Sequence, residues 1–145
     1  MKIYVINGPN INMLGIREPS IYGKEDYSAL KTLIEEYCAK KGILTEVYQS
    51  NHEGDLVDKI QEAYFEKVDG IVINPGAYTH TSIALFDALK SVSIPAVEVH
   101  ISKVEEREEF RQVSYIRKAC VKTVTGEGLR GYLTAIDFLL EMPEK

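Results

Sequence analysis

Short apolar runs alternate with longer amphipathic segments along the chain. Five mostly apolar runs, rich in β-branched residues, predict strands at residues 3–6, 44–48, 70–73, 96–99 and 120–124. Between them, apolar residues recur at helical spacing and predict helices at residues 27–41, 55–66, 82–90 and 129–140, with a short acidic helix near 104–111. Because apolar strands alternate with helices, the pattern indicates a parallel sheet that is covered on both faces.

The fold class that this pattern predicts is α/β, a flavodoxin-like three-layer α/β/α sandwich with a five-stranded parallel sheet. The length of 145 residues, of which 45% are apolar, suits a single domain over residues 1–145. Within the helices, the spacing places Tyr64 and Ala84 against the core and Lys59 toward water.

The composition is mildly acidic, with 22 Asp and Glu against 17 Lys and Arg and a formal charge of −5. Nucleic acid is therefore not expected as the main partner, whereas a few local arginines suffice to bind a small anion. No apolar run approaches the roughly 18 residues of a membrane span, and the chain turns polar early, so we expect no membrane partner and a cytoplasmic location. Cys38 and Cys120 lack metal-site spacing and are expected to be buried free thiols.

Polar side chains follow the predicted strands, and the carboxyl ends of parallel strands meet at one edge of a sheet, where ligands bind. They are Asn7, Asn10, Asn12, Arg17 and Tyr22 after the first strand, Asn74, Tyr78, Thr79 and His80 after the third, and His100, Ser102, Arg107 and Arg111 after the fourth. The glycines match neither a phosphate-binding P-loop nor a dinucleotide fingerprint. The long segment after the first strand has the length of a functional lid.

Four segments carry a specific signature. They read GPNINMLGIREPSIYG at residues 8–23, QSNHEG at 49–54, INPGAYTHTS at 73–82, and EVHIS with REEFR at 98–102 and 107–111. In this order, and over nearly the whole chain, they resemble the type II 3-dehydroquinate dehydratase family. The chain departs from the family pattern at Phe86, where an arginine is common, and at Lys103, where an asparagine is common.

The resemblance implies a hydro-lyase of the shikimate pathway, which leads to the aromatic amino acids. Its reaction is the reversible loss of water from 3-dehydroquinate to give 3-dehydroshikimate through an enolate. It implies no cofactor, and no cluster has the spacing of metal ligands.

The resemblance also assigns catalytic roles. Tyr22 matches the base, and because an ordinary tyrosine has a pKa of roughly 10, the nearby cation Arg17 is expected to favour its ionised form. Asn10 matches the residue that stabilises the enolate oxygen. His100 matches the general acid. Glu98 lies two residues before it, on the same face of a strand, where a carboxylate favours the protonated imidazole and fixes its tautomer.

Substrate-binding roles follow in the same way. Asn74, His80 and Arg111 match residues that bind the substrate hydroxyls. Ile101 and Ser102 are expected at the N-terminus of the short acidic helix, where backbone N–H groups bind a carboxylate. The run from Ser102 to Glu105 also fits a capping box, which would give the Ser102 hydroxyl to its own helix.

The resemblance further implies a homo-oligomer, a dodecamer of four trimers, in which Asp87 reaches the pocket of a neighbouring subunit. By helical periodicity Asp87 lies on the outer face of its helix, which also fits plain exposure to solvent.

Ordinary structural roles stay open beside these assignments. Asn10 and Asn74 suit turns, His80 suits a helix cap, and Tyr22, His100 and Arg111 suit a solvated rim. Two rival functions use the same fold: an FMN-binding flavodoxin-like electron carrier and a non-catalytic carboxylate-binding module. A colourless protein argues against the first, and turnover of 3-dehydroquinate argues against the second.

Overall fold

The sheet occupies the middle of the molecule in this computed structural model, which describes residues 1–16 and 25–143. Its strands are β1 (Lys2–Asn7), β2 (Leu44–Gln49), β3 (Gly70–Asn74), β4 (Ala96–His100) and β5 (Lys122–Thr125). They pair in the order β2-β1-β3-β4-β5, and every neighbouring pair is parallel. The parallel sheet predicted from the apolar runs is thus confirmed.

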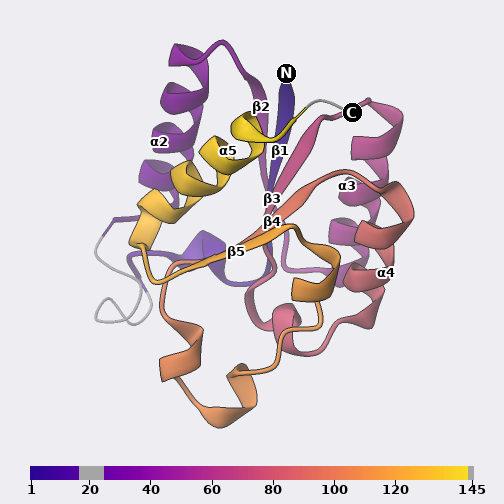
Figure 1. The fold of residues 1–145 in the computed structure, drawn as a ribbon. Coiled ribbons are helices and arrows are strands. Elements are labelled where there is room, and N and C mark those ends of the chain that lie inside the picture. The colour runs from indigo at the N-terminus through magenta and orange to yellow at the C-terminus, as the bar shows by residue number, and fades with distance from the viewer. Residues whose placement is uncertain (17–24, 144–145) are drawn as a thin grey trace.

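Helices cover both faces of this sheet (Figure 1). The helices α2 (Tyr27–Lys40) and α5 (Gly131–Glu141) pack on one face, and α3 (Glu53–Phe65) and α4 (Ile83–Val92) on the other. Alternate residues of β1 pack against the two helical layers, because successive side chains of a strand point to opposite faces. Ile3 and Val5 are buried with α2 and α5, whereas Tyr4 and Ile6 are buried with α3 and α4. The arrangement is the flavodoxin-like three-layer sandwich.

Local sequence fixes where the helices begin. Asp26 accepts a hydrogen bond from the backbone N–H of Ala29 at 2.8 Å and caps α2. The Ser82 hydroxyl accepts one from the N–H of Leu85 at 3.0 Å and caps α4. Both caps stand where the polar-to-apolar transition predicts a helix start.

The predicted helix at 104–111 is wrong. Two separate 3-10 turns, η3 (Val104–Glu106) and η4 (Glu109–Arg111), take its place. In this segment Val104 alone is buried, so no apolar stripe is present to hold a helix against the core. The N-cap of η3 is Lys103, and no side chain caps it, so the expected capping box of Ser102 does not form either.

Side-chain burial corrects four further expectations. Lys59 is buried although it was expected to face water, and Tyr64 and Ala84 are exposed although the periodicity placed them inward. Cys38 is buried as a free thiol, but Cys120 is only half-buried and precedes β5, which begins two residues later than predicted.

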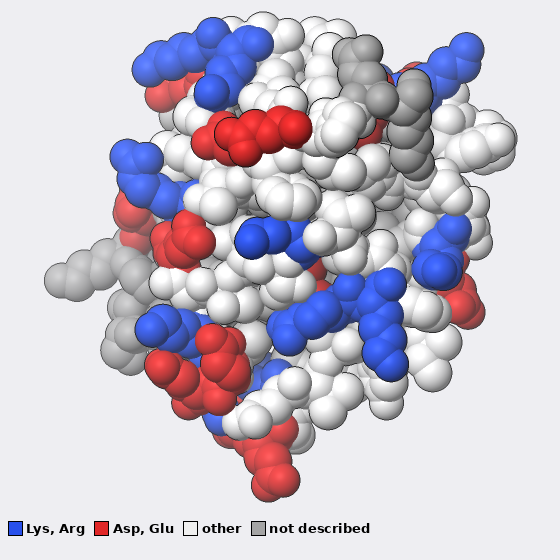
Figure 2. Space-filling model, viewed as in Figure 1, with Lys and Arg blue, Asp and Glu red and all other residues white. Residues whose placement is uncertain are grey.

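Charged side chains of both signs are interspersed over the face drawn in Figure 2, and neither sign forms a continuous surface. Within residues 1–16 and 25–143, no helix combines the length and the apolar character needed to cross a membrane.

Candidate active site

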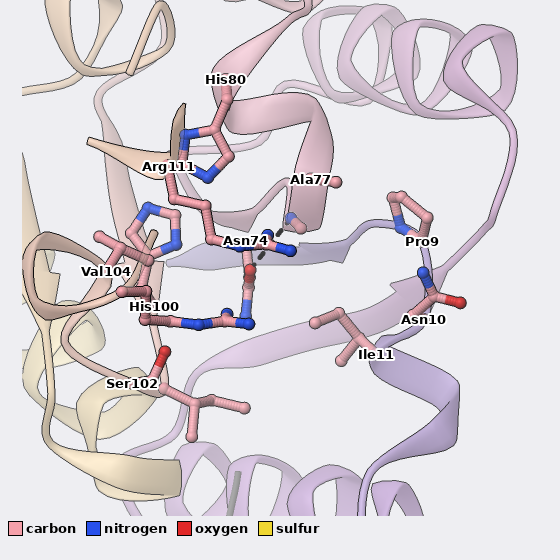
Figure 3. Close-up of a pocket in the computed structure, with 13 residues that line it drawn as sticks. Pro9, Asn10, Ile11, Asn74, Ala77, His80, His100, Ser102, Val104 and Arg111 are labelled. Carbon is pink, nitrogen blue, oxygen red and sulfur yellow. Dashed lines mark hydrogen bonds between the residues drawn. The ribbon is translucent and has the colours of Figure 1, made fainter. Parts of the chain in front are cut away.

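A pocket lies at the carboxyl edge of the sheet, where the segments after β1, β3 and β4 meet (Figure 3). Eight of the residues singled out in the sequence line it together: Asn10, Asn74, His80, His100, Ile101, Ser102, Arg107 and Arg111. In the close-up, Pro9 and Asn10 stand on the side opposite His100 and Ser102, and Arg111 extends between them. Strand ends therefore predict this site well.

His100 is the last residue of β4 and is 5% exposed. Its Nε2 lies 2.5 Å from Oε2 of Glu98, whose side chain is fully buried. The two share a face because they are two residues apart on one strand. With Nε2 held by the carboxylate, Nδ1 is the nitrogen left to exchange a proton with a bound molecule.

Asn74 ends β3 and is held at both ends of its amide. Its Nδ2 donates to the Tyr132 hydroxyl at 2.8 Å, and its Oδ1 accepts from the N–H of Gly76 at 3.2 Å. The Tyr132 hydroxyl donates in turn to Oδ1 of Asn7 at 2.7 Å. Burial raises the pKa of Tyr132 well above its ordinary value, so the hydroxyl keeps its proton and orients both asparagines. Tyr132 was not predicted from the sequence, because the periodicity of α5 marks it only as a core residue.

His80 ends the 3-10 helix η2 (Gly76–His80). Its Nδ1 lies 2.7 Å from the carbonyl oxygen of Val113, so Nδ1 carries a proton and donates. Burial lowers the pKa of His80, with smaller contributions from His100 and Arg111, and the ring is neutral at pH 7. Its Nε2 is then an acceptor that suits a hydroxyl group.

Arg111 lies in η4 with its guanidinium anchored on one side. Its Nε donates to a carboxylate oxygen of Glu108, and this contact holds the pKa of Glu108 below its usual range. The guanidinium also lies over the Phe110 ring, 5.2 Å from the centroid. Arg107 lines the same pocket, although the sequence analysis placed it only near this edge and gave it no role. The sequence feature that could have predicted this position is the motif REEFR, which begins with Arg107 and ends with Arg111.

The backbone after β4 is held by the segment that follows β5. The N–H of Gly126 donates to the His100 carbonyl at 3.2 Å, and the N–H of Gly128 donates to the Ile101 carbonyl at 3.1 Å. Ile101 and Ser102 thus line the pocket, but they do not begin a helix, so a helix dipole does not act on a ligand here.

Asn10 adopts a left-handed backbone conformation at φ 69°. Its N–H donates to Oδ1 of Asn51 at 3.0 Å, and Nε2 of Gln49 lies 3.1 Å from the same oxygen. These contacts tie the segment after β1 to the segment after β2. Asn10 therefore both forms a turn and lines the pocket.

Arg17 and Tyr22 lie outside the described residues, so their roles stay predictions. Asp87 is exposed on α4 and is not part of the pocket lining, in agreement with its expected place on the outer helix face.

The pocket chemistry suits a polar anion. A histidine with a carboxylate partner can move a proton, two arginines can bind negative charge, and the amides and the neutral His80 can bind hydroxyls. Among the described residues, no group of three or more His, Cys, Asp or Glu is arranged to hold a metal ion.

Known proteins resemble this chain over nearly its full length. A sequence model of the family described as dehydroquinase class II matches residues 1–140. The 3-dehydroquinate dehydratases of Lachnoclostridium phytofermentans and Lachnospira eligens are 58% and 56% identical, over 98% and 100% of this chain and 98% and 99% of theirs. The crystal structure of the type II dehydroquinase from Butyrivibrio crossotus superposes with a TM-score of 0.97 at 61% identity, covering 97% of this chain and 98% of that one. Since one family is matched in sequence and in structure from end to end, the chain belongs to the class II dehydroquinases.

Proposed function

We propose that the protein is a type II 3-dehydroquinate dehydratase, a hydro-lyase of the shikimate pathway. It converts 3-dehydroquinate reversibly to 3-dehydroshikimate and water. The observation that carries the proposal is the Glu98–His100 pair at the rim of a pocket that also holds arginines and amides. The names of the full-length relatives support the same reaction.

The reaction needs a base, a group that stabilises an enolate, and an acid. In the proposed sequence, the phenolate of Tyr22 takes the proton next to the substrate ketone, and the electron pair of that C–H bond forms the enolate. Asn10 stabilises the enolate oxygen through its amide N–H groups. Reformation of the ketone then expels the hydroxyl group, which leaves as water with a proton from His100. Arg17 favours the ionised form of Tyr22.

The remaining polar groups hold the substrate. Backbone N–H groups of Ile101 and Ser102 bind its carboxylate, and Asn74, His80 and Arg111 bind its hydroxyls. The short distance between Nε2 of His100 and Glu98, 2.5 Å, supports the acid role, because the carboxylate orients the ring and leaves Nδ1 free to face a bound molecule. No cofactor enters these steps.

Assembly and location complete the proposal. We propose a homo-oligomer, a dodecamer of four trimers, in which the exposed Asp87 on α4 reaches the pocket of a neighbouring subunit. The location proposed is the cytoplasm.

A direct assay tests the reaction. Purified protein is mixed with 3-dehydroquinate, and the ultraviolet absorbance of the conjugated product is followed. We expect the wild-type protein to turn over 3-dehydroquinate. We expect kcat to fall about 1,000-fold or more in Tyr22→Phe and about 100-fold or more in His100→Gln. Tyr22→Phe is expected to bind the substrate nearly as well as wild type, because it removes a base and little contact area.

Other outcomes identify the rival functions. Binding of 3-dehydroquinate without any turnover by the wild-type protein points to a carboxylate-binding module. A yellow protein that retains FMN points to an electron carrier. Substantial activity in Tyr22→Phe would contradict the proposed base.

A further inference from the structure

The Glu98 carboxylate has more partners than His100. Its side chain is fully buried, and a buried carboxylate is costly unless its oxygens accept hydrogen bonds. Oε2 faces Nε2 of His100 at 2.5 Å. The other contacts come from the segment after η4, which carries none of the residues given a role above.

Ser114 supplies these contacts at close range. Its hydroxyl oxygen lies 3.0 Å from Oε1 and 3.2 Å from Oε2 of Glu98, so one O–H is shared between both carboxylate oxygens. The same oxygen accepts from the backbone N–H of Arg117 at 3.1 Å. Since that N–H occupies a lone pair of the hydroxyl, the hydroxyl proton is directed at the carboxylate.

We infer that Ser114 is a positioning residue for the proposed reaction: it fixes the plane of the Glu98 carboxylate, and through it the orientation of the His100 ring. The inference rests on the proposed acid role of His100. Ser114 is not part of the pocket lining, so it acts through Glu98 and not on the substrate. A displacement of a catalytic group by a fraction of an ångström lowers turnover more than it lowers binding.

Arg117 adds a weaker contribution. It begins η5 (Arg117–Ala119), and its guanidinium lies 3.7 Å from Oε2 of Glu98 while its side chain is 49% exposed. Solvent screens such a contact, so its effect on Glu98 is smaller than that of the Ser114 hydroxyl.

Groups from several elements lie near the Glu98 carboxylate. Besides Ser114, they are His100 on β4, Arg117 on η5, Cys120 before β5 and His80 at the end of η2. Burial, and then the charge of Glu98, raises the pKa of Cys120 to about 12, so this thiol stays neutral.

The test compares Ser114→Ala with wild type. We expect kcat to fall about 5- to 20-fold with KM within about twofold, because the lost contact orders the acid and not the substrate. Arg117→Gln is expected to lower kcat by less than Ser114→Ala does, because its contact with Glu98 is longer and half-exposed.

Two variants separate positioning from stability. Ser114→Thr keeps the hydroxyl and is expected to restore kcat to within about threefold of wild type. Thr134→Ala removes a comparable hydroxyl–carboxylate bond, 2.7 Å long, between Thr134 on the exposed side of α5 and Glu127, which precedes that helix. It is expected to leave kcat unchanged.

Nuclear magnetic resonance of the histidine rings gives a readout that does not depend on turnover. The chain has three histidines, so the His100 ring can be assigned with a His100→Gln variant. The Nε2 proton of His100 is expected to exchange with water faster in Ser114→Ala than in wild type. Faster exchange supports the inference even if the wild-type protein does not turn over 3-dehydroquinate. Unchanged kcat and unchanged exchange in Ser114→Ala, with an active wild type, overturn it.

Discussion

Lys59 is a buried cation at the junction of three elements. On α3, 9% of its side chain is exposed, and its Nζ lies 2.6 Å from both Oε2 of Glu46 on β2 and Oε2 of Glu62 on α3. The ammonium also lies over the rings of Tyr4 and Tyr48, 4.7 and 5.0 Å from their centroids. The Tyr4 hydroxyl donates to Glu62 at 2.8 Å. One ammonium group therefore joins β1, β2 and α3.

Burial by itself lowers the pKa of Lys59, but the hydrogen bonds to Glu46 and Glu62 together raise it more. The pKa of Lys59 therefore lies above its ordinary value. The same contact with Lys59 holds the pKa of Glu62 below its usual range. The group is thus a charged cluster at neutral pH, which explains how a lysine expected to face water is accommodated inside.

We expect Lys59→Met to lower the free energy of unfolding at pH 7 by about 1–2 kcal/mol, because two half-exposed carboxylates lose their shared cation. Denaturation by urea, followed by circular dichroism, measures the change. Lys31→Met on the exposed side of α2 is the matched control. It is expected to change the free energy of unfolding by less than about 0.5 kcal/mol.

The effect of Lys59→Met is also expected to depend on pH. Because the pKa of folded Glu62 is lowered, its ionised form stabilises the fold above the unfolded pKa of about 4.3, and this contribution is lost as pH falls through the folded value. The difference between wild type and Lys59→Met therefore shrinks toward pH 3. A difference that stays constant from pH 7 to pH 3 would show that lost packing of the lysine stem, and not its charge, causes the destabilisation.

The segments after β1 and β3 approach each other closely at two glycines. The N–H of Gly8 donates to the Asn74 carbonyl at 2.7 Å, and a Cβ atom on Gly8 would stand 2.3 Å from the carbonyl oxygen of Pro75. Gly76 has φ +60°, and a Cβ atom there would stand 2.8 Å from the carbonyl oxygen of Pro9. These contacts set the spacing between the segments that carry Asn10 and Asn74.

Gly8→Ala is expected to separate these two segments, because the added methyl group meets backbone that cannot move aside. We expect a loss of about 2 kcal/mol or more in the free energy of unfolding and a fall of about tenfold or more in kcat/KM. Gly54→Ala is the control: Gly54 lies in the first turn of α3 with no atom within 4 Å of its added Cβ. It is expected to raise stability by up to about 1 kcal/mol, since alanine favours a helix. Equal stability of the two variants would contradict the close approach.

Apolar periodicity predicts the five strands and four helices to within about two residues because burial on the sheet dictates both. It fails for residues 104–111, where the chain follows the pocket rim in 3-10 turns with few buried side chains of its own. Such a segment is held by contacts to other elements, which a local pattern does not contain.

The same reason divides the site residues. Asn74 and His100 are predictable because each ends a strand, and strand ends share an edge. Tyr132 bonds to Asn74 and Ser114 bonds to Glu98, which lie 58 and 16 residues away in sequence. The local sequence around Tyr132 and Ser114 does not predict these partners. Lys59 is similar, because its two carboxylates and two rings come from three elements.

The pocket lies at the carboxyl edge of the sheet, whereas Asp87 is on the exposed side of α4 in the layer that covers one face (Figure 1). Ile83, at the start of the same helix, is 58% exposed. A subunit that packs against this side of α4 would bury both residues. A role for Asp87 in catalysis then requires a second copy of the chain.

Mixing two inactive variants tests that requirement. Asp87→Asn and His100→Asn subunits are unfolded, combined in equal amounts and refolded. A site is intact only where a subunit with His100 meets a neighbour with Asp87, so we expect about a quarter of wild-type activity from random assembly into rings. His100→Asn mixed with Asn74→Ala is the control and is expected to stay inactive, because both residues line one pocket of one chain. If the first mixture shows no more activity than its separate components, Asp87 does not act across a subunit boundary.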